Sequence, residues 1–169
     1  MNIFEAYLNK YGQMIILILG LPCSNKSELA KELIIDLNIP KININSYLKE
    51  TAFIEKNIDG IEFKLYEHVD NYNWDKLNQD INTAKSKGII LYGNYIDVTK
   101  IDFTIDFTYF INMNTGLCKK LLQEKKLLPY SSSDEKVKIY FDSTFHKVSL
   151  TIDLRSLKYI HSKKIIGAI

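Results

Sequence analysis

The stretch Gly20-Leu-Pro-Cys-Ser-Asn-Lys-Ser27 decides the fold of this chain, because it separates an apolar run from an amphipathic segment. The apolar run, Met14–Leu19, contains no polar residue and is typical of a strand buried on both faces of a parallel sheet. After the loop, residues 29–37 keep one helical face apolar until Pro40 stops the pattern. A strand, a loop of this composition and a helix, in this order, predict a phosphate-binding loop.

Each part of this loop has a role in binding a phosphate group. Backbone N–H groups and the positive end of the following helix surround the phosphate oxygens. We expect Lys26 to place its ammonium group on the β- and γ-phosphates and Ser27 to offer its hydroxyl to Mg²⁺. The usual pattern, G-x-x-x-x-G-K-[ST], has glycine where this chain has Asn25, a residue type that tolerates a positive φ. The alternative is an ordinary strand-to-helix turn in which Gly20 and Lys26 occur by chance.

Strands and helices alternate along the rest of the chain. This alternation predicts a mostly parallel central sheet with helices on both faces, that is, a three-layer α/β/α fold. The expected elements are a strand at 41–45, a helix from Trp74 to near Gly88, strands at 89–92 and 107–111, a helix from 115 to about 126 and a last strand at 148–154.

Length and composition predict one folded domain. The chain has 169 residues, of which 46% are hydrophobic and 25% charged, which is far from the composition of disordered chains. Residues 14–169 form the expected domain, and residues 1–13 form a helical extension. Its side chains Ile3, Phe4, Tyr7, Leu8 and Tyr11 fall on one stripe, which we expect to pack on the domain.

Charge and cysteine content indicate which kinds of partner and which cellular compartment to expect. A net charge of +2 gives no field that would hold nucleic acid by neutralising phosphates. No apolar run reaches the ~18 residues of a membrane span, so we expect neither a nucleic acid nor a membrane as partner. Cys23 and Cys118 lie far apart in sequence and match no disulfide framework, which favours a reducing, cytoplasmic setting. We expect Cys23 only to fill space in the loop.

A second segment, Tyr66–Leu77, resembles the uridine kinase family. It reads YEHVDNYNWDKL, and five of its twelve residues are identical to the family's FDHPDAFDWDLL. The phosphate loop precedes it, and residues 45–49, 89–93 and 110–124 resemble the family's DDFYK-like turn, VVIVEG strand and lid helix in the same order. The related nicotinamide riboside kinases share most of this order. The resemblance therefore implies a P-loop NTPase fold of the kinase type.

The resemblance also implies an activity, which is transfer of the γ-phosphoryl group of ATP, with Mg²⁺, to the 5′-hydroxyl of a nucleoside. The family's general base corresponds to Asn45, whose amide cannot accept a proton at neutral pH. Its glutamate near the metal corresponds to Tyr92. Glu67 matches the acid that contacts the ribose hydroxyls, and Lys119 and Lys120 match the paired lid arginines that bind ATP.

These substitutions leave two hypotheses. The first is a small-molecule kinase that uses ATP and Mg²⁺ on a nucleoside or a similar ribose-bearing acceptor, because phosphoryl transfer depends chiefly on positioning and charge. The second is a catalytically impaired nucleotide-binding protein of kinase ancestry that acts by binding or partner contact. Asn25, Asn45 and Tyr92 favour the second, as does the short connection from Leu77 to Ile89, which leaves no room for the family's base-recognising segment. The sequence leaves the acceptor and the oligomeric state open.

Overall fold

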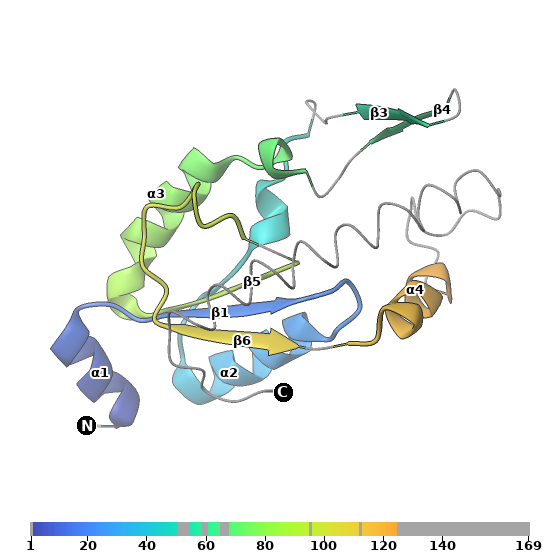
Figure 1. Cartoon of the computed structure of the whole chain (residues 1–169). Helices are drawn as coiled ribbons and strands as arrows, with labels where there is room; N and C mark the ends of the chain where they lie inside the picture. The colour runs from blue at the N-terminus through green and yellow to red at the C-terminus, as the bar shows by residue number, and fades with distance from the viewer. Residues whose placement is uncertain are drawn as a thin grey trace.

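The computed structural model describes residues 2–50, 55–58, 61–64, 68–94, 96–111 and 113–124 (Figure 1). The strand expected at 148–154 lies outside these residues. The described helices are α1 (Ile3–Tyr11), α2 (Lys26–Leu37), α3 (Trp74–Ala84) and α4 (Thr115–Glu124), and the 3₁₀ turns are η1 (Ile44–Tyr47), η2 (Val69–Asn71) and η3 (Lys85–Lys87). The strands are β1 (Ile15–Gly20), β2 (Lys41–Asn43), β3 (Glu55–Ile58), β4 (Ile61–Lys64), β5 (Ile89–Gly93) and β6 (Phe107–Ile111).

The main sheet has four strands in the order β2-β5-β1-β6, and all of its pairs are parallel. Strand β1 is central, with Ile15 opposite Ile89 of β5 and Ile16 opposite Phe107 of β6. Every residue of β1 is buried, as the apolar run predicted. Because the strands are parallel, their carboxyl ends meet at one edge, where the loop after Gly20 begins.

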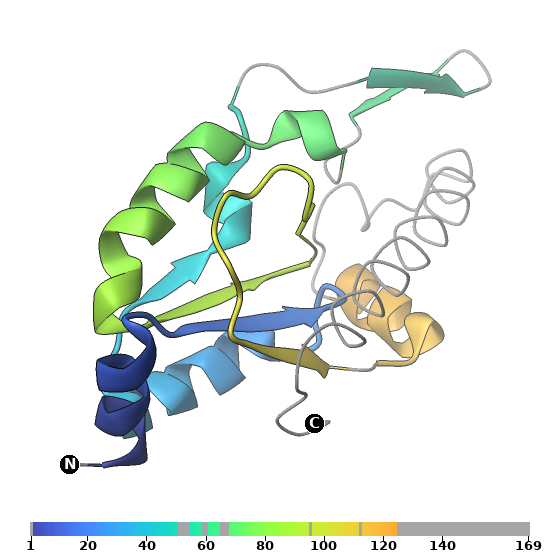
Figure 2. The ribbon, with the colours of Figure 1, turned by 60° about the vertical axis from the view of Figure 1, so that its left-hand side comes forward.

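Successive residues of β1 point into two different cores. Leu17 and Leu19 pack in a cluster with Leu77 and Ile81 of α3, whereas Ile18 packs in a second cluster with Ala30 of α2. Helices α3 and α2 therefore cover opposite faces of the sheet, which the two views of the ribbon also show (Figures 1 and 2). The predicted three-layer α/β/α architecture is confirmed.

Helix α1 is present as expected, but only part of its stripe packs on the domain. A capping box between Asn2 and Glu5 starts the helix. Tyr7 packs against Phe107, with ring centroids 5.0 Å apart and the ring planes tilted by 51°. In contrast, 91% of Ile3 is exposed. Phe4, in the first turn, also packs against the cluster that contains Ala30. Helix α1 therefore packs on the domain through part of its stripe, while Ile3 stays exposed.

Two local features differ from the sequence prediction. The strand expected at 41–45 ends at Asn43, because the Asn43 side chain accepts a hydrogen bond from the Asn45 N–H and turns the chain into η1. The antiparallel pair β3–β4 was not predicted. Its sequence signal was Asp59-Gly60, a dipeptide typical of hairpin turns, between two short strands. Among the described residues, no helix is long and apolar enough to cross a bilayer.

Candidate functional site

The candidate site is the loop Leu21–Asn25, which joins the carboxyl end of β1 to α2 (Figure 2). The loop turns directly over Gly20. A Cβ atom on Gly20 would lie 2.5 Å from the Ser24 hydroxyl oxygen and 3.2 Å from the Ile111 carbonyl oxygen. Only glycine therefore allows this close approach, which gives a physical reason for the glycine at the start of the motif.

The backbone φ angle changes sign from residue to residue between Cys23 and Asn25 of the loop. Cys23 has φ +64° and Asn25 has φ +59°, and Ser24 between them is not among the residues with positive φ. Such alternation is typical of the concave nests that bind anions. The Ser24 N–H donates to the Leu21 carbonyl oxygen at 3.2 Å, which fixes the turn of the loop. The expectation that Asn25 adopts the left-handed conformation is confirmed, with ψ 19°.

The first turn of α2 adds further donors to this nest. The carbonyl of Asn25, the N-cap residue, accepts hydrogen bonds from the N–H groups of Glu28 and Leu29, at 3.0 and 3.1 Å. The Asn25 side chain makes no cap hydrogen bond. The N–H groups of Lys26 and Ser27 have no acceptor within the helix, and they lie at its positive end. The loop and the helix together thus offer several backbone donors to an anion.

The Lys26 side chain folds back over the loop. Its Nζ donates a hydrogen bond to the Leu21 carbonyl oxygen at 2.9 Å. Burial lowers the pKa of Lys26 to about 8, and the nearby thiols of Cys118 and Cys23 only partly oppose this effect. Among the described residues, no carboxylate forms an ion pair with Lys26. A bound phosphate would give this ammonium group a negatively charged partner.

Helix α4 contacts the loop through a residue that sequence reasoning missed. The thiol of Cys118 is fully buried and donates a hydrogen bond to the Pro22 carbonyl oxygen, with Sγ and O 2.6 Å apart. Nothing local in the sequence signals this contact, because it joins residues 96 positions apart. Ser24 is also buried, and its hydroxyl has no hydrogen-bond partner in the described part of the chain.

The residues at the two family carboxylate positions lie in different surroundings. Asn45 stands in η1, just after β2, and its Oδ1 is 3.5 Å from the Tyr72 hydroxyl. Tyr92, near the end of β5, packs with the α2-side core, and Lys41 Nζ lies 5.7 Å from the centre of its ring. Glu67, the expected ribose ligand, lies outside the described residues.

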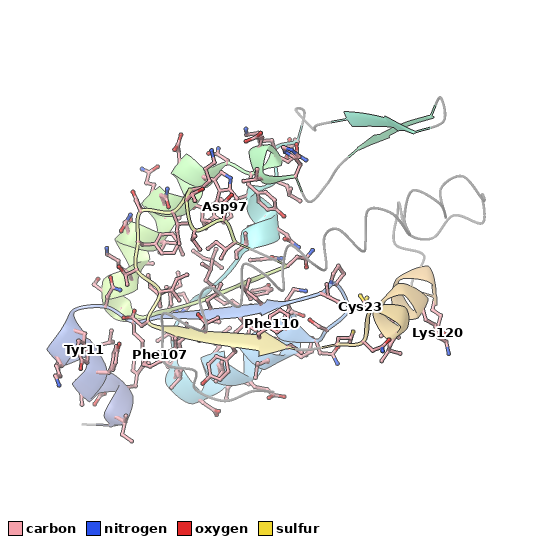
Figure 3. The ribbon with its side chains drawn as sticks, in the orientation of Figure 1. Tyr11, Cys23, Asp97, Phe107, Phe110 and Lys120 are labelled. Carbon is pink, nitrogen blue, oxygen red and sulfur yellow. The ribbon has the colours of Figure 1, made fainter. Side chains whose placement is uncertain are left out.

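The two lysines predicted to bind ATP from the lid belong to α4, at the same edge of the sheet. The structure describes the backbone of Lys119. Lys120 is exposed, its Nζ lies 3.9 Å from Glu124 Oε1, and Figure 3 shows it on the side of α4 away from Cys23. The structure therefore brings Cys118, rather than Lys120, to the phosphate loop.

The donors at this site fit a Mg²⁺ ion that is held mainly by phosphates. Mg²⁺ prefers oxygen ligands and commonly binds through one or two protein oxygens together with substrate phosphates. Ser27, in the first turn of α2, offers one hydroxyl oxygen. Within the described ranges, no group of three or more His, Cys, Asp or Glu residues is arranged to hold a metal ion.

The sheet order, the loop and its lysine together define a three-layer α/β/α fold of the P-loop NTPase type. No known family model and no curated protein matches the sequence. Among solved structures, the chain is similar to shikimate kinase from Bacteroides thetaiotaomicron, at 14% identity and a TM-score of 0.44 over 92% of this chain and 86% of that one. It is also similar to thymidylate kinase from Candida albicans, at 17% identity and a TM-score of 0.48 over 93% and 85%. These comparisons do not confirm the resemblance to uridine kinases.

Proposed function

We propose that this chain binds ATP at residues 20–27 and transfers the γ-phosphoryl group to a hydroxyl of a nucleoside or a similar small ribose-bearing acceptor. The observation that carries the proposal is the nest of backbone donors at the carboxyl end of β1, with the Lys26 ammonium group folded across it. A concave set of donors at a helix N-terminus binds phosphate groups through geometry that any polyphosphate can meet.

In this proposal the residues of the loop hold and orient the triphosphate. The loop amides bind the phosphate oxygens, and Lys26 exchanges its hydrogen bond with Leu21 for one with a phosphate. Ser27 would offer its hydroxyl to Mg²⁺, which when bound neutralises charge between the β- and γ-phosphates. The bond from the γ-phosphorus to the β-phosphate oxygen breaks while a new bond forms to the acceptor oxygen. Holding these atoms in line supplies most of the catalysis.

The acceptor would lie near Asn45, which follows β2 at the same edge of the sheet as the loop. Its amide can orient a hydroxyl by hydrogen bonding but cannot take the proton, which in this mechanism leaves to solvent. Glu67 is the proposed ribose contact, by resemblance alone. The proposed ATP contacts from α4 are Lys119 and Lys120, and the exposed position of Lys120 makes it the weaker of the two.

A second candidate function is nucleotide binding without catalysis. It is favoured by the two missing carboxylates. Asn45 holds an amide where the family has its base, and the ring of Tyr92 packs with the α2-side core. A protein of this kind would bind the triphosphate with the same loop and would act through a bound partner.

Incubation with γ-labelled ATP, Mg²⁺ and a panel of nucleosides separates the two functions. The kinase proposal predicts label on at least one acceptor, loss of transfer in Lys26→Ala and full transfer in Lys31→Ala. Lys31 is a matched control because it lies on α2 as well, is exposed and pairs with Glu28. Binding of ATP with no transfer, and no rate gained in Asn45→Asp, would contradict the kinase proposal and support the second function.

A further inference from the structure

The fold brings the two cysteines of this chain together at the phosphate loop. They are the only cysteines in the sequence, and they lie 95 positions apart. Cys118 Sγ is 2.6 Å from the carbonyl oxygen of Pro22, which is bonded directly to Cys23. Standard backbone dimensions put that oxygen about 2.8 Å from the Cys23 Cα, so Cys118 Sγ lies within about 5.4 Å of that Cα.

A disulfide joins residues whose Cα atoms are about 4.4–6.8 Å apart. Because the limit of about 5.4 Å runs from a sulfur to a Cα, rotation of the two side chains and a small movement of α4 would bring the pair into that range. Figure 3 shows Cys23 in the loop beside α4, the helix that carries Cys118. The two thiols are also close enough to interact electrostatically with each other and with Lys26. Both cysteines are free thiols in the structure.

We propose that Cys23 and Cys118 form a reversible disulfide that ties the phosphate loop to α4 and prevents it from binding phosphate. The two thiols differ in access. Cys23 is partly exposed and meets a dissolved oxidant first, whereas Cys118 is fully buried. This order suits a pair in which one cysteine reacts and the other resolves the product.

The oxidant is a low-molecular-weight disulfide, such as oxidised glutathione. The thiolate of Cys23 attacks one sulfur of that disulfide, the S–S bond breaks, and the first glutathione leaves as a thiol. Cys118 then attacks the Cys23 sulfur of the mixed disulfide and the second glutathione leaves. Two protein thiols lose two electrons and two protons, and one glutathione disulfide becomes two glutathione thiols. Burial raises the pKa of Cys118 to about 12, so the second step needs a brief opening of α4 from the loop.

The disulfide changes the part of the loop that forms the nest. Cys118 can no longer donate its S–H to the Pro22 carbonyl, and Cys23, whose φ is +64°, is held by its sulfur toward α4. The backbone around residues 23 to 25, where the φ angles of Cys23 and Asn25 are positive, is thereby distorted. This effect on phosphate rests on the proposed function, whereas the formation of the bond does not.

The first test is the mass of the folded, full-length chain after treatment with oxidised glutathione. Because the chain has only two cysteines, a monomer that has lost two hydrogens must contain this bond. We expect the folded protein to form it at least ten times faster than the same protein in concentrated urea, and dithiothreitol to reverse it. A lasting glutathione adduct on Cys23, disulfide-linked dimers alone, or equal rates with and without urea would overturn the proposal.

The second test compares triphosphate binding by the reduced and oxidised protein. We expect oxidation to weaken ATP binding at least tenfold, and to have no such effect in Cys23→Ser, which lacks the partly exposed thiol and keeps only the buried Cys118. Cys118→Ser cannot release the glutathione from Cys23, so binding is compared only for monomers that have lost two hydrogens. Equal ATP affinity before and after disulfide formation would overturn the inhibitory role. If the reduced protein binds no ATP, the proposed function is wrong. The mass of the oxidised protein still shows whether the disulfide forms.

Discussion

The two ends of strand β1 are built in opposite ways. At the amino end, the Ile15 N–H donates to Asp106 Oδ2 at 2.8 Å, and the Ile15 carbonyl accepts from the Asp106 N–H at 3.0 Å. Gln13 Nε2 donates to the same carboxylate at 3.1 Å, and the Tyr7 hydroxyl donates to its other oxygen at 3.2 Å. One carboxylate therefore binds the strand, the preceding segment and helix α1 together.

At the carboxyl end, the backbone donors of the loop and of the first turn of α2 gather around an open nest. In the proposed function, a bound anion accepts hydrogen bonds from the donors of this nest. In that proposal, the amino end of β1 stabilises the fold and the carboxyl end binds phosphate. Changes at the amino end should alter the free energy of unfolding, and changes at the carboxyl end should alter affinity for phosphate.

The largest effect is expected from Gly20→Ala. The new Cβ would lie 2.5 Å from Ser24 Oγ and 3.2 Å from the Ile111 carbonyl oxygen, so the buried Ser24 side chain and the backbone beside it must shift. We expect ATP affinity, measured by calorimetry, to fall by more than ~100-fold, or about 2.7 kcal/mol. Gly12→Ala is the control at the other end of β1, because a Cβ there has open space and only the positive φ of 73° is strained. If Gly12→Ala lost ATP affinity, or if Gly20→Ala kept it, the proposed division between the two ends of β1 would be wrong.

The next effect concerns the amino end. Asp106→Ala removes the acceptor for the Tyr7 hydroxyl and for the buried N–H of Ile15. An unsatisfied buried donor costs roughly 1–3 kcal/mol, so we expect the free energy of unfolding in urea to fall by about 2 kcal/mol. ATP affinity should stay within twofold of the unchanged protein. If Asp106→Ala had normal stability but weak ATP binding, the amino end of β1 would contribute to binding rather than to stability.

The third effect is a pH dependence that belongs to the carboxyl end alone. The pKa of Lys26 is about 8, so the group is mostly a charged ammonium at pH 7 and mostly neutral at pH 9. We expect ATP affinity to fall about tenfold between these pH values, because only the ammonium attracts phosphate. Calorimetry in buffers of different ionisation enthalpy should show proton uptake on binding near pH 8. A flat profile would contradict the prediction, and Lys26→Met should give one.

The same pKa has a consequence for stability, with a defined sign. The folded-state pKa lies below the ordinary value of 10.5, so the folded chain binds fewer protons than the unfolded chain between about pH 8 and pH 10.5. In that window the contribution of Lys26 to the free energy of unfolding rises with pH, and below pH 8 its burial cost is fully present.

The smallest effect is expected from Lys120→Ala. Lys120 is exposed and lies 3.9 Å from Glu124 on the surface of α4, and such pairs contribute less than ~1 kcal/mol. We expect unfolding in urea to change by no more than about 0.5 kcal/mol and ATP affinity to change less than threefold. A tenfold loss of affinity would mean that α4 rotates Lys120 toward the nucleotide, as the resemblance to the kinase lid implies.

Much of the fold could be predicted from the sequence because it depends on local patterns. The apolar run before Gly20 specified a strand buried on both faces, and the helices α2 and α3 followed from apolar spacing. The left-handed Asn25 followed from its place at the glycine position of the motif and from its residue type. These features are encoded within a few residues of each other, where chain stereochemistry and burial decide the outcome.

The rest of the site depends on contacts between distant residues. The hydrogen bond from Cys118 to Pro22 forms only because α4 packs beside the loop, and no local sequence pattern predicts that packing. The outward position of Lys120 depends on the rotation of the same helix, and the exposure of Ile3 depends on where α1 meets the corner of the sheet. Sequence reasoning therefore predicted the backbone conformation of the loop and missed the side chain that packs against it.

The central claim is that the loop after β1, with one ammonium group across it, binds a triphosphate. The most direct measurement is the Kd for ATP of the unchanged protein, Lys26→Ala and Lys31→Ala, determined by calorimetry at pH 7. We predict that Lys26→Ala weakens binding by roughly 100-fold, because a partly buried charge-assisted hydrogen bond to phosphate is lost, and that Lys31→Ala leaves it unchanged. Equal affinity in all three proteins would contradict the claim.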